Sequence, residues 1–380
     1  MRIVACAAED PWDPCTFSGY SNRLFSALAA ASNEILPIAT SKIGLSDILR
    51  GALTIDPGRW PRIRPRVNPN WYWSRGSFEV MAKRFNRKLN NTAGIDAIIQ
   101  IGTHILPSDR ATPFYCVTDA TIRQVTEAGK FSVSNCSPSV IEEAMACQRE
   151  VFRRCWQIFV LSEWTASGIV SDYGISRDRV SVIGAGANVP VTSIQRAGSS
   201  SPSILFVGYD WERKGGPLLL EAFRVVKKKV PSAELMVVGC SPPVEERGIK
   251  IIGKLNPRSQ TDRIKLVKLY SQASVFSILP TFDPFPNVLL EAAMFGLPIV
   301  SVDEGSRREA VIDGVTGFLA THRDPEAIAA LLIRLLTDAP LAHELGDAAR
   351  ERAIRQFTWP VVAGAMLNDI KRRNSELRNS

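Results

Sequence analysis

Short apolar runs alternate with segments of helical hydrophobic period along most of the chain. In the first half, the strand-like runs are RIVACAA, EILPIA, IDAIIQIG, PFYCVT and QIFVLS, and the helical patterns cover residues 19–31, 140–155 and 164–173. In the second half, the strand-like runs are SILFVG, AELMVVG, IKIIG and VFSIL, and the helical patterns cover 217–229 and a stretch ending at Ser271. This alternation is typical of βαβ units, in which helices connect parallel strands. It predicts an α/β protein built from parallel sheets.

The chain has 380 residues, which is too many for one ordinary hydrophobic core. A polar, Ser-rich stretch over 190–202 shows little periodicity and reads as a linker. We therefore expect a first domain over 1–189, a second over 203–357 and a final helical segment over 358–380. Two α/β halves around one linker favour a ligand site in a cleft between them.

The stretch 281–301, TFDPFPNVLLEAAMFGLPIVS, predicts a strand end, a loop carrying Asp283 and one helix of about three turns. A proline at the first helical position and a glycine at the end mark its limits. The open amides of Asn287 and Val288 can attract an anion such as a diphosphate. Asp283 and Glu291 flank that position and can accept hydrogen bonds from hydroxyl groups. The alternative is a solvated helix whose acids suit its first turn.

A second candidate site is the turn Arg213, Lys214, Gly215, Gly216, which follows the strand SILFVG and precedes a helix. Arginine can donate to two oxygens at once and lysine adds a compact charge, so the pair suits a dianionic leaving group. The alternative is an exposed basic loop. This turn repeats the strand-to-helix placement of the Asp283 segment.

The first half offers weaker candidates. Gly19 lies where the first strand's loop meets a helix, so the backbone can approach an anion there, although a glycine at such a turn can also be purely geometric. Asp119 ends the strand PFYCVT and either faces a ligand or caps the next turn. His104 occupies a similar strand end.

Several classes of protein are disfavoured. Seven scattered cysteines without a CxxC pair predict reduced thiols in a cytoplasmic protein, and three histidines without a cluster argue against a metal site. GAGAN at 184–188 is an incomplete dinucleotide motif, and neither a Walker sequence nor a GxSxG elbow is present. No apolar run reaches membrane-span length.

The formal net charge is +8, and the segment 59–88 carries nine basic residues and one acidic residue, interleaved with aromatic ones. Phe78, Met81, Phe85 and Leu89 share one face of a helical pattern. The segment could contact an anionic membrane surface or hold an acidic or diphosphate-bearing acceptor. The alternative is a helix that packs on its own domain. Nucleic acid is not expected as a partner, because no recognition motif supports it.

Several ordered motifs together resemble a known family. ILFVGYDWERKGGPLLLEAF, ELMVVG, GKL, DPFPNVLLEAAMFGLPIVS and EAVIDGVTGFL are similar to the family 4 retaining glycosyltransferases of the GT-B fold. The resemblance covers the second half and implies two Rossmann-like domains facing across a cleft. It also implies a nucleotide diphosphate sugar bound mainly by the second domain and an acceptor bound mainly by the first. The last helix, FTWPVVAGAMLNDIKRR, would cross back to the first domain.

The resemblance also assigns roles to residues. Asp283 would contact the transferred sugar, Glu291 the ribose hydroxyls and Lys214 the diphosphate. The family's usual arginine is replaced by Tyr209, and we propose that Arg213 supplies that charge. The expected catalytic residues are Arg213, Lys214, Asp283 and Asp119. The expected donor-binding residues are Gly19, Gly253, Lys254, Leu255, Phe285, Asn287, Val288 and Glu291.

The function expected on this basis is retaining transfer of a hexose-type sugar from a nucleotide diphosphate donor to an acceptor hydroxyl. Polysaccharide or glycolipid synthesis is the expected setting, in the cytoplasm or at the inner face of the membrane, without a metal or another cofactor. Two alternatives remain open. One is a GT-B epimerase or hydrolase that needs no acceptor, and the other is a non-catalytic member that binds a glycan or a membrane.

Overall fold

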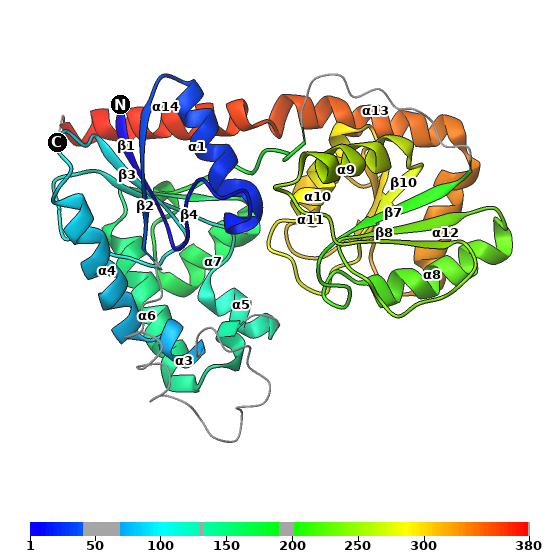
Figure 1. Ribbon diagram of the computed structural model, residues 1–380, viewed down its shortest axis with the longest axis horizontal. Helices are drawn as coiled ribbons and strands as arrows, with labels where there is room; N and C mark the ends of the chain where they lie inside the picture. Colours follow the sequence, from blue (N-terminus) through cyan, green and yellow to red (C-terminus); the bar gives the residue numbers. More distant parts are fainter. Residues whose placement is uncertain (41–68, 130–131, 190–200, 379–380) are drawn as a thin grey trace. The chain divides into compact units, whose positions relative to one another are not determined.

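The computed structural model describes residues 1–40, 69–129, 132–189 and 201–378. The chain forms two compact units: the first contains Met1–Gly184 and Ala363–Ser380, and the second contains Ala185–Val362. Each unit holds one six-stranded sheet with helices on its faces (Figure 1). The expected α/β fold with two Rossmann-like domains is confirmed. Most of the linker predicted over 190–202 lies outside the described residues.

The sheet of the first unit has the strand order β2-β1-β3-β4-β5-β6, with every neighbouring pair parallel. Its strands are β1 (Arg2–Ala7), β2 (Glu34–Ala39), β3 (Ala97–Ile101), β4 (Phe114–Thr118), β5 (Gln157–Val160) and β6 (Val180–Val182). Every residue of β3, β4 and β5 is buried. Continuous apolar runs are expected where helices cover both faces of a parallel sheet.

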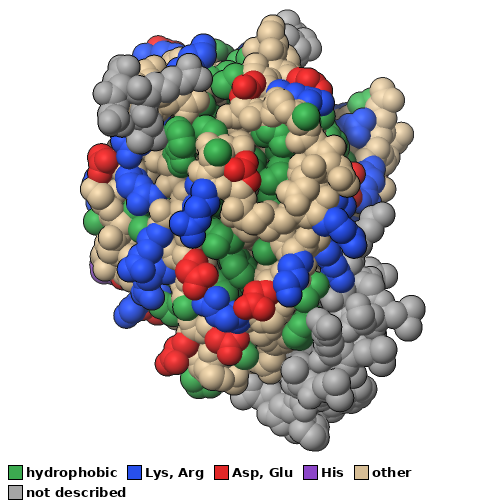
Figure 2. All heavy atoms as spheres, turned by 90° about the vertical axis from the view of Figure 1, so that its left-hand side faces the viewer, with side chains coloured by type: hydrophobic (Ala, Val, Ile, Leu, Met, Phe, Trp, Pro, Cys, Tyr) green, Lys and Arg blue, Asp and Glu red, His purple; other side chains and the backbone are tan. Residues whose placement is uncertain are grey.

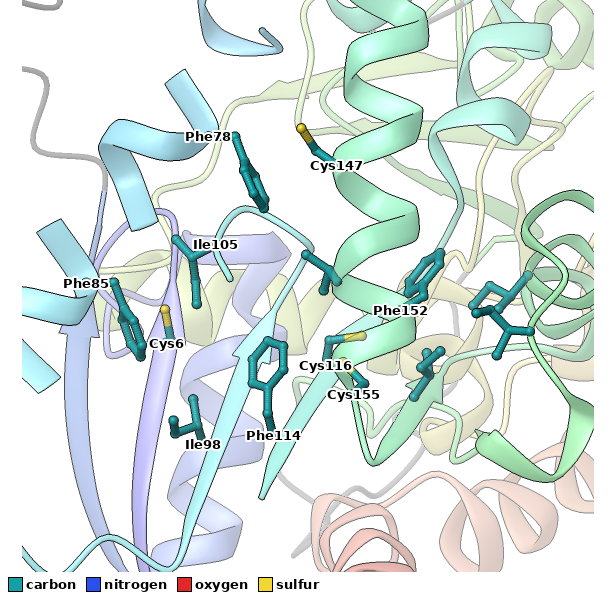
Figure 3. Packing of buried hydrophobic residues seen from close by; sticks show 14 of the residues in the cluster. Cys6, Phe78, Phe85, Ile98, Ile105, Phe114, Cys116, Cys147, Phe152 and Cys155 are labelled. Atoms are coloured by element: carbon teal, nitrogen blue, oxygen red, sulfur yellow. The ribbon is translucent and has the colours of Figure 1, made fainter. Parts of the chain in front are cut away.

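The helices of the first unit are η1 (Thr16–Gly19), α1 (Tyr20–Ala30), α3 (Pro69–Tyr72), α4 (Arg75–Leu89), α5 (Ile122–Ala128), η3 (Ser132–Asn135), α6 (Pro138–Arg154), α7 (Glu163–Tyr173) and η4 (Arg177–Arg179). Among these, α4 settles one alternative from the sequence. Its apolar residues Phe78, Met81, Phe85 and Leu89 are buried in the core of the unit. Figure 3 shows Phe85 beside Cys6 of β1 and Phe78 near Ile105, which belongs to the same buried cluster. The apolar face of α4 therefore packs on its own domain.

The sheet of the second unit has the order β12-β11-β10-β7-β8-β9 and is also parallel. Its strands are β7 (Ser203–Val207), β8 (Glu234–Val238), β9 (Ile249–Gly253), β10 (Val275–Ser277), β11 (Ile299–Val302) and β12 (Gly317–Ala320). Its helices are α8 (Gly216–Lys229), α9 (Gln260–Gln272), α10 (Asn287–Met294), α11 (Arg307–Ala310), α12 (Pro325–Thr337) and α13 (Ala339–Gln356). The short strand β12 was not foreseen from the sequence.

The helix expected after Asp283 is shorter than predicted. Helix α10 has eight residues, close to two turns rather than three, and Pro286 is its N-cap rather than its first helical residue. Gly296 follows the helix with a φ of +66°, a backbone conformation that glycine adopts without strain. The amides of Asn287 and Val288 are thus those of the first turn, as expected.

The last helix, α14 (Trp359–Arg378), begins in the second unit, and its residues from Ala363 onward belong to the first. Met366 and Ile370 are fully buried. The Tyr115 hydroxyl on β4 donates to Asn374 Oδ1 at 2.8 Å. The predicted return of the final helix to the first domain is confirmed. Within the described part of the chain, no helix is long and apolar enough to cross a membrane.

Candidate functional site

The pairing of β7 with β10 brings together the two segments of the second half that were predicted to bind phosphate. They are the basic turn 213–216 and the stretch 281–301. Beyond the strand ends, the Leu279 amide donates to the Lys214 carbonyl at 3.1 Å and the Thr281 amide donates to the Arg213 carbonyl at 2.9 Å. Since β7 and β10 are parallel neighbours, their carboxyl ends lie at the same edge of the sheet. The structure thus joins the basic turn to the segment that carries Asp283.

Lys214 and Asp283 form a buried ion pair at this sheet edge. Lys214 Nζ donates to Asp283 Oδ2, and the two side chains are 12% and 9% exposed. Arg213 Nη1 lies 3.9 Å from the same carboxylate oxygen and donates to the Phe282 carbonyl at 3.0 Å. Two cations therefore surround one carboxylate in a region with little solvent, where electrostatic interactions are stronger than in water.

The two glycines of the basic turn have a packing role that the sequence did not reveal. Gly215 has a φ of +78°, and a Cβ there would lie 1.8 Å from the Leu279 carbonyl oxygen. A Cβ on Gly216 would lie 2.1 Å from the Trp211 ring. The glycines therefore allow the turn to approach the end of β10 closely, which sets the position of Lys214.

The first turn of α10 leaves donors available for a ligand. No described side chain caps this helix, and backbone N–H groups at a helix start favour anions. Asn287 Oδ1 is buried without a hydrogen-bond partner among the described residues. Phe285, in the loop just before the helix, is buried. A diphosphate fits this combination of open amides and nearby cations.

Glu291 is held by a tyrosine that sequence reasoning missed. The Tyr270 hydroxyl donates to Glu291 Oε2 at 2.8 Å, and both residues are buried. The Tyr270 ring stacks on Phe295 at 5.1 Å and on Phe276 at 5.9 Å. Burial and the adjacent Glu291 charge raise the pKa of Tyr270 well above its usual value. Nothing in the residue spacing links Tyr270, on α9, to Glu291.

Residues 253–255, which were predicted to bind the donor, lie at the end of β9 and directly after it. Gly253 ends this strand with a φ of +79°, Lys254 is exposed and Leu255 is partly buried. The Tyr209 hydroxyl lies 3.5 Å from the Leu255 carbonyl oxygen, and the residue is 65% exposed. Tyr209 therefore reaches toward this stretch from the end of β7 and cannot supply the missing cation.

The predicted residues of the first unit lie near the start of α1. Phe17, Ser18 and Gly19 have φ values of +50°, +56° and +84°. Two consecutive non-glycine residues in this region are uncommon, and such backbone strain is concentrated at functional sites. Burial and, secondarily, the charge of Asp119 raise the pKa of Tyr20, the first residue of α1. The Asp119 charge therefore acts on the residue that follows Gly19.

Asp119 does not occupy the N-cap position of the helix that follows it. Helix α5 is capped by Thr121, whose side chain accepts from the Gln124 amide while the Gln124 side chain accepts from the Thr121 amide. Asp119 precedes this capping box. Its backbone carbonyl accepts a hydrogen bond from Thr165 Oγ1.

His104 lies beside the rings of Tyr72 and Trp73, with ring centres 6.2 and 6.3 Å away. Burial lowers the pKa of His104 to about 4, so the ring is neutral at neutral pH. Among the described residues, no group of three or more His, Cys, Asp or Glu side chains is arranged to hold a metal ion.

The two six-stranded parallel sheets, one in each unit, have the architecture of the GT-B fold. Residues 193–352 match the family model described as glycosyl transferases group 1. The match covers less than half of the chain and lies within the second unit.

The chain is 29% identical over 248 residues to a D-inositol 3-phosphate glycosyltransferase of Corynebacterium diphtheriae, covering 58% of this chain and 57% of that relative. It thus spans little more than half the length of that relative. It is 26% identical over 390 aligned positions to a glycogen synthase of Mycobacterium tuberculosis, covering 96% and 93% of the two chains. A sucrose-phosphate synthase structure from Thermosynechococcus elongatus has the same fold, with a TM-score of 0.68, 18% identity and coverage of 99% and 100%.

Proposed function

We propose that the protein transfers a hexose-type sugar, with retention at the anomeric carbon, from a nucleoside diphosphate sugar to an acceptor hydroxyl. The observation that carries this proposal is the buried Lys214–Asp283 pair, with Arg213 beside it, at the strand edge that leads into the uncapped start of α10. The family match and the fold support the same reaction class. Retention follows from the resemblance of the second half to retaining enzymes.

In this mechanism, the bond between the anomeric carbon and the diphosphate oxygen breaks while negative charge gathers on the diphosphate. Lys214, Arg213 and the first amides of α10 stabilise that charge, because preorganised donors lower the barrier where charge develops. The acceptor hydroxyl forms the new bond to the anomeric carbon, and its proton passes to the departing diphosphate oxygen. In this proposal, the transfer requires neither a metal nor another cofactor.

Donor recognition in this proposal uses residues around the same edge. Asp283 accepts a hydrogen bond from a sugar hydroxyl once the diphosphate competes for Lys214. Glu291, fixed by Tyr270, accepts from the ribose hydroxyls, and the backbone of 253–255 contacts the base. Carboxylates held by a positioned partner are well suited to this role, since their geometry is set before the ligand binds.

The acceptor is proposed to be a glycan or a lipid-linked glycan bound mainly by the first unit. Contact with an anionic membrane surface would use the exposed Lys83, Arg87 and Lys88 of α4, since the apolar residues of that helix face the core. Figure 2 shows that Lys and Arg side chains on one side of the molecule are interspersed with Asp and Glu. This mixture favours weak, salt-sensitive contact over insertion.

A cytoplasmic location is proposed from the cysteines. All seven lie in described residues and none forms a disulfide. Burial raises the pKa values of the Cys136, Cys147 and Cys240 thiols to about 11, so they are unreactive at neutral pH. Cys116 and Cys155 lie close together in the core (Figure 3) without forming a disulfide bond. Such a set is typical of a reducing compartment.

The test is a thermal-shift screen with UDP-glucose, GDP-mannose and ADP-glucose, followed by product analysis. A donor at a hundred times its dissociation constant should add about 2.7 kcal/mol of stability. The donor that binds should yield a glycosylated product only when an acceptor is added. Epimerised sugar from donor alone would contradict transfer, as would the absence of any stabilising donor and of any product.

A further inference from the structure

A buried arginine outside the predicted site contacts the segment that carries Asp283. Arg307, the first residue of α11, is 3% exposed. Its Nη1 donates to the Asp283 carbonyl oxygen at 3.2 Å, and its Nη2 donates to Glu304 Oε2 at 3.2 Å. Its Nε has no hydrogen-bond partner among the described residues.

Glu304 links Arg307 to a second arginine. Arg323 donates through Nε to Glu304 Oε1 at 2.9 Å and through Nη2 to Oε2 at 2.8 Å. Arg323 also donates to the Leu279 carbonyl at 3.1 Å and to the Pro280 carbonyl. One carboxylate therefore joins two guanidinium groups that hold opposite ends of the stretch 279–283.

Side chains satisfy most backbone carbonyls of this segment. The carbonyls that accept from side chains, with their donors, are Leu279 and Pro280 from Arg323, Phe282 from Arg213, Asp283 from Arg307 and Pro284 from Ser306. Buried carbonyls need a partner, and an irregular segment has no ladder to provide one. The conformation of the segment thus depends on this set of side chains.

Stability alone does not account for a charged group at position 307. Burial lowers the pKa of Arg307, and the nearby charges of Glu304 and Asp283 only partly oppose this. A buried ion pair often contributes less to stability than a well-packed apolar side chain of similar volume. A rigid fork that donates to a loop carbonyl does, however, fix geometry, which active sites require.

We propose that Arg307 is a positioning residue for sugar transfer, acting through the Asp283 carbonyl to fix the Asp283 carboxylate opposite Lys214. Glu304 is the bridge that orients Arg307. This inference rests on the proposed function. Within the described part of the chain, no hydrogen bond or ion pair joins Arg307 to the groups assigned to the nucleotide, which are Lys214, the α10 amides and Glu291. Its loss should therefore act on the reaction and not on nucleotide affinity.

The test compares Arg307→Met and Arg307→Lys with Arg308→Met as a matched control. Arg308 is the next residue on α11, is 72% exposed and pairs with Asp303. Turnover is measured with UDP-glucose, GDP-mannose or ADP-glucose, and calorimetry measures binding of the corresponding nucleoside diphosphate. A misplacement of about 1 Å can cost about 10²-fold in rate, so we expect kcat to fall about 10- to 10²-fold in both Arg307 variants.

Nucleoside diphosphate affinity should stay within about threefold in both Arg307 variants, and Arg308→Met should match the unsubstituted protein in kcat. Arg307→Lys is decisive because it keeps the charge and loses the planar fork. A normal kcat in Arg307→Met, full rescue by Arg307→Lys, or a loss of affinity as large as the loss of kcat would each overturn the proposal.

Glu304→Gln keeps the test valid if Arg307→Met does not fold. It preserves the shape of the bridge and removes its charge, so kcat should again fall while nucleoside diphosphate affinity holds. Normal kcat in Glu304→Gln would overturn the proposal. An unsubstituted protein that neither binds a nucleoside diphosphate nor cleaves a donor would instead overturn the proposed function itself, and with it this inference.

Discussion

Tyr270 and Glu291 illustrate how single residues are prepared for a ligand. The Tyr270 hydroxyl occupies one oxygen of the Glu291 carboxylate, and stacking on Phe276 and Phe295 fixes the ring. A buried carboxylate without a donor would be costly, since removing one partner of a buried pair leaves an unsatisfied group. The tyrosine therefore supports the orientation proposed for ribose binding.

Replacing Tyr270 by Phe should lower the free energy of unfolding by about 1–3 kcal/mol, because a hydrogen bond to a charged group is lost. It should also weaken binding of the preferred nucleoside diphosphate, measured by calorimetry. Tyr115→Phe is the matched control, since its hydroxyl also donates to a side chain, that of Asn374 in the first unit. Equal nucleotide affinity in the two variants would contradict the role of Tyr270.

Some residues of the candidate site can be predicted from the sequence, and others cannot. Asp283, Glu291 and Lys214 follow from their placement at helix starts and from the family resemblance. Tyr270 and Arg307 do not, because each acts through a contact made by residues from another element. A tyrosine near a helix end and an arginine among surface-like residues carry no local signal of burial.

At the scale of elements, the site depends on strand order. The pattern of apolar runs predicts β7 and β10 and their carboxyl ends, but it does not say which strands are neighbours. Their pairing places the basic turn against the stretch after β10. The sequence pattern also overestimated the length of α10. The helix ends at Met294, because the chain must continue from there into β11. Strand neighbours and helix ends are set by tertiary packing.

A substitution at Gly215 tests how much stability depends on the close approach between the basic turn and the end of β10. Gly215→Ala should destabilise the protein by about 2–4 kcal/mol, combining a left-handed alanine with overpacking against the Leu279 carbonyl. The measurement is chemical denaturation. Gly174→Ala is the control, because Gly174 has a similar φ of +64° and nothing within 4 Å of its Cβ position. Equal losses in the two variants would show that packing at Gly215 has no additional effect.

At the scale of the whole molecule, the pattern of apolar runs predicted the two parallel sheets, and the family resemblance predicted the return of helix α14 to the first unit. The roles of the first unit are less specified. Asp119 and Gly19 both belong to that unit, whereas the charged cluster around Asp283 lies entirely in the second unit. Their joint action in transfer is a prediction of the proposed function.

The partly buried His104 makes stability depend on pH. Its pKa is about 4 in the folded protein, below its ordinary value of 6.5, so the unfolded chain takes up the proton first. The stabilising effect of neutral His104 is present above pH 6.5 and is lost as pH falls toward 4. Because the ring is partly exposed, we expect a loss of about 1–3 kcal/mol.

The measurement is the unfolding midpoint of the unsubstituted protein and of His104→Asn between pH 7 and 4.5. The unsubstituted protein should lose stability more steeply as the pH falls. The pH dependence that comes from the carboxylates is common to both proteins and cancels in the comparison. Parallel pH profiles would contradict a neutral, buried His104.

The central claim is that Lys214 stabilises the charge of a departing nucleoside diphosphate. Lys214→Ala, assayed at saturating nucleotide sugar, tests it most directly, with the exposed Lys228→Ala on α8 as the control. We expect Lys214→Ala to lower turnover by about 10²-fold or more, as when one charge-stabilising donor is removed, and Lys228→Ala to leave turnover unchanged. Near-normal turnover in Lys214→Ala would contradict this role of Lys214 in sugar transfer.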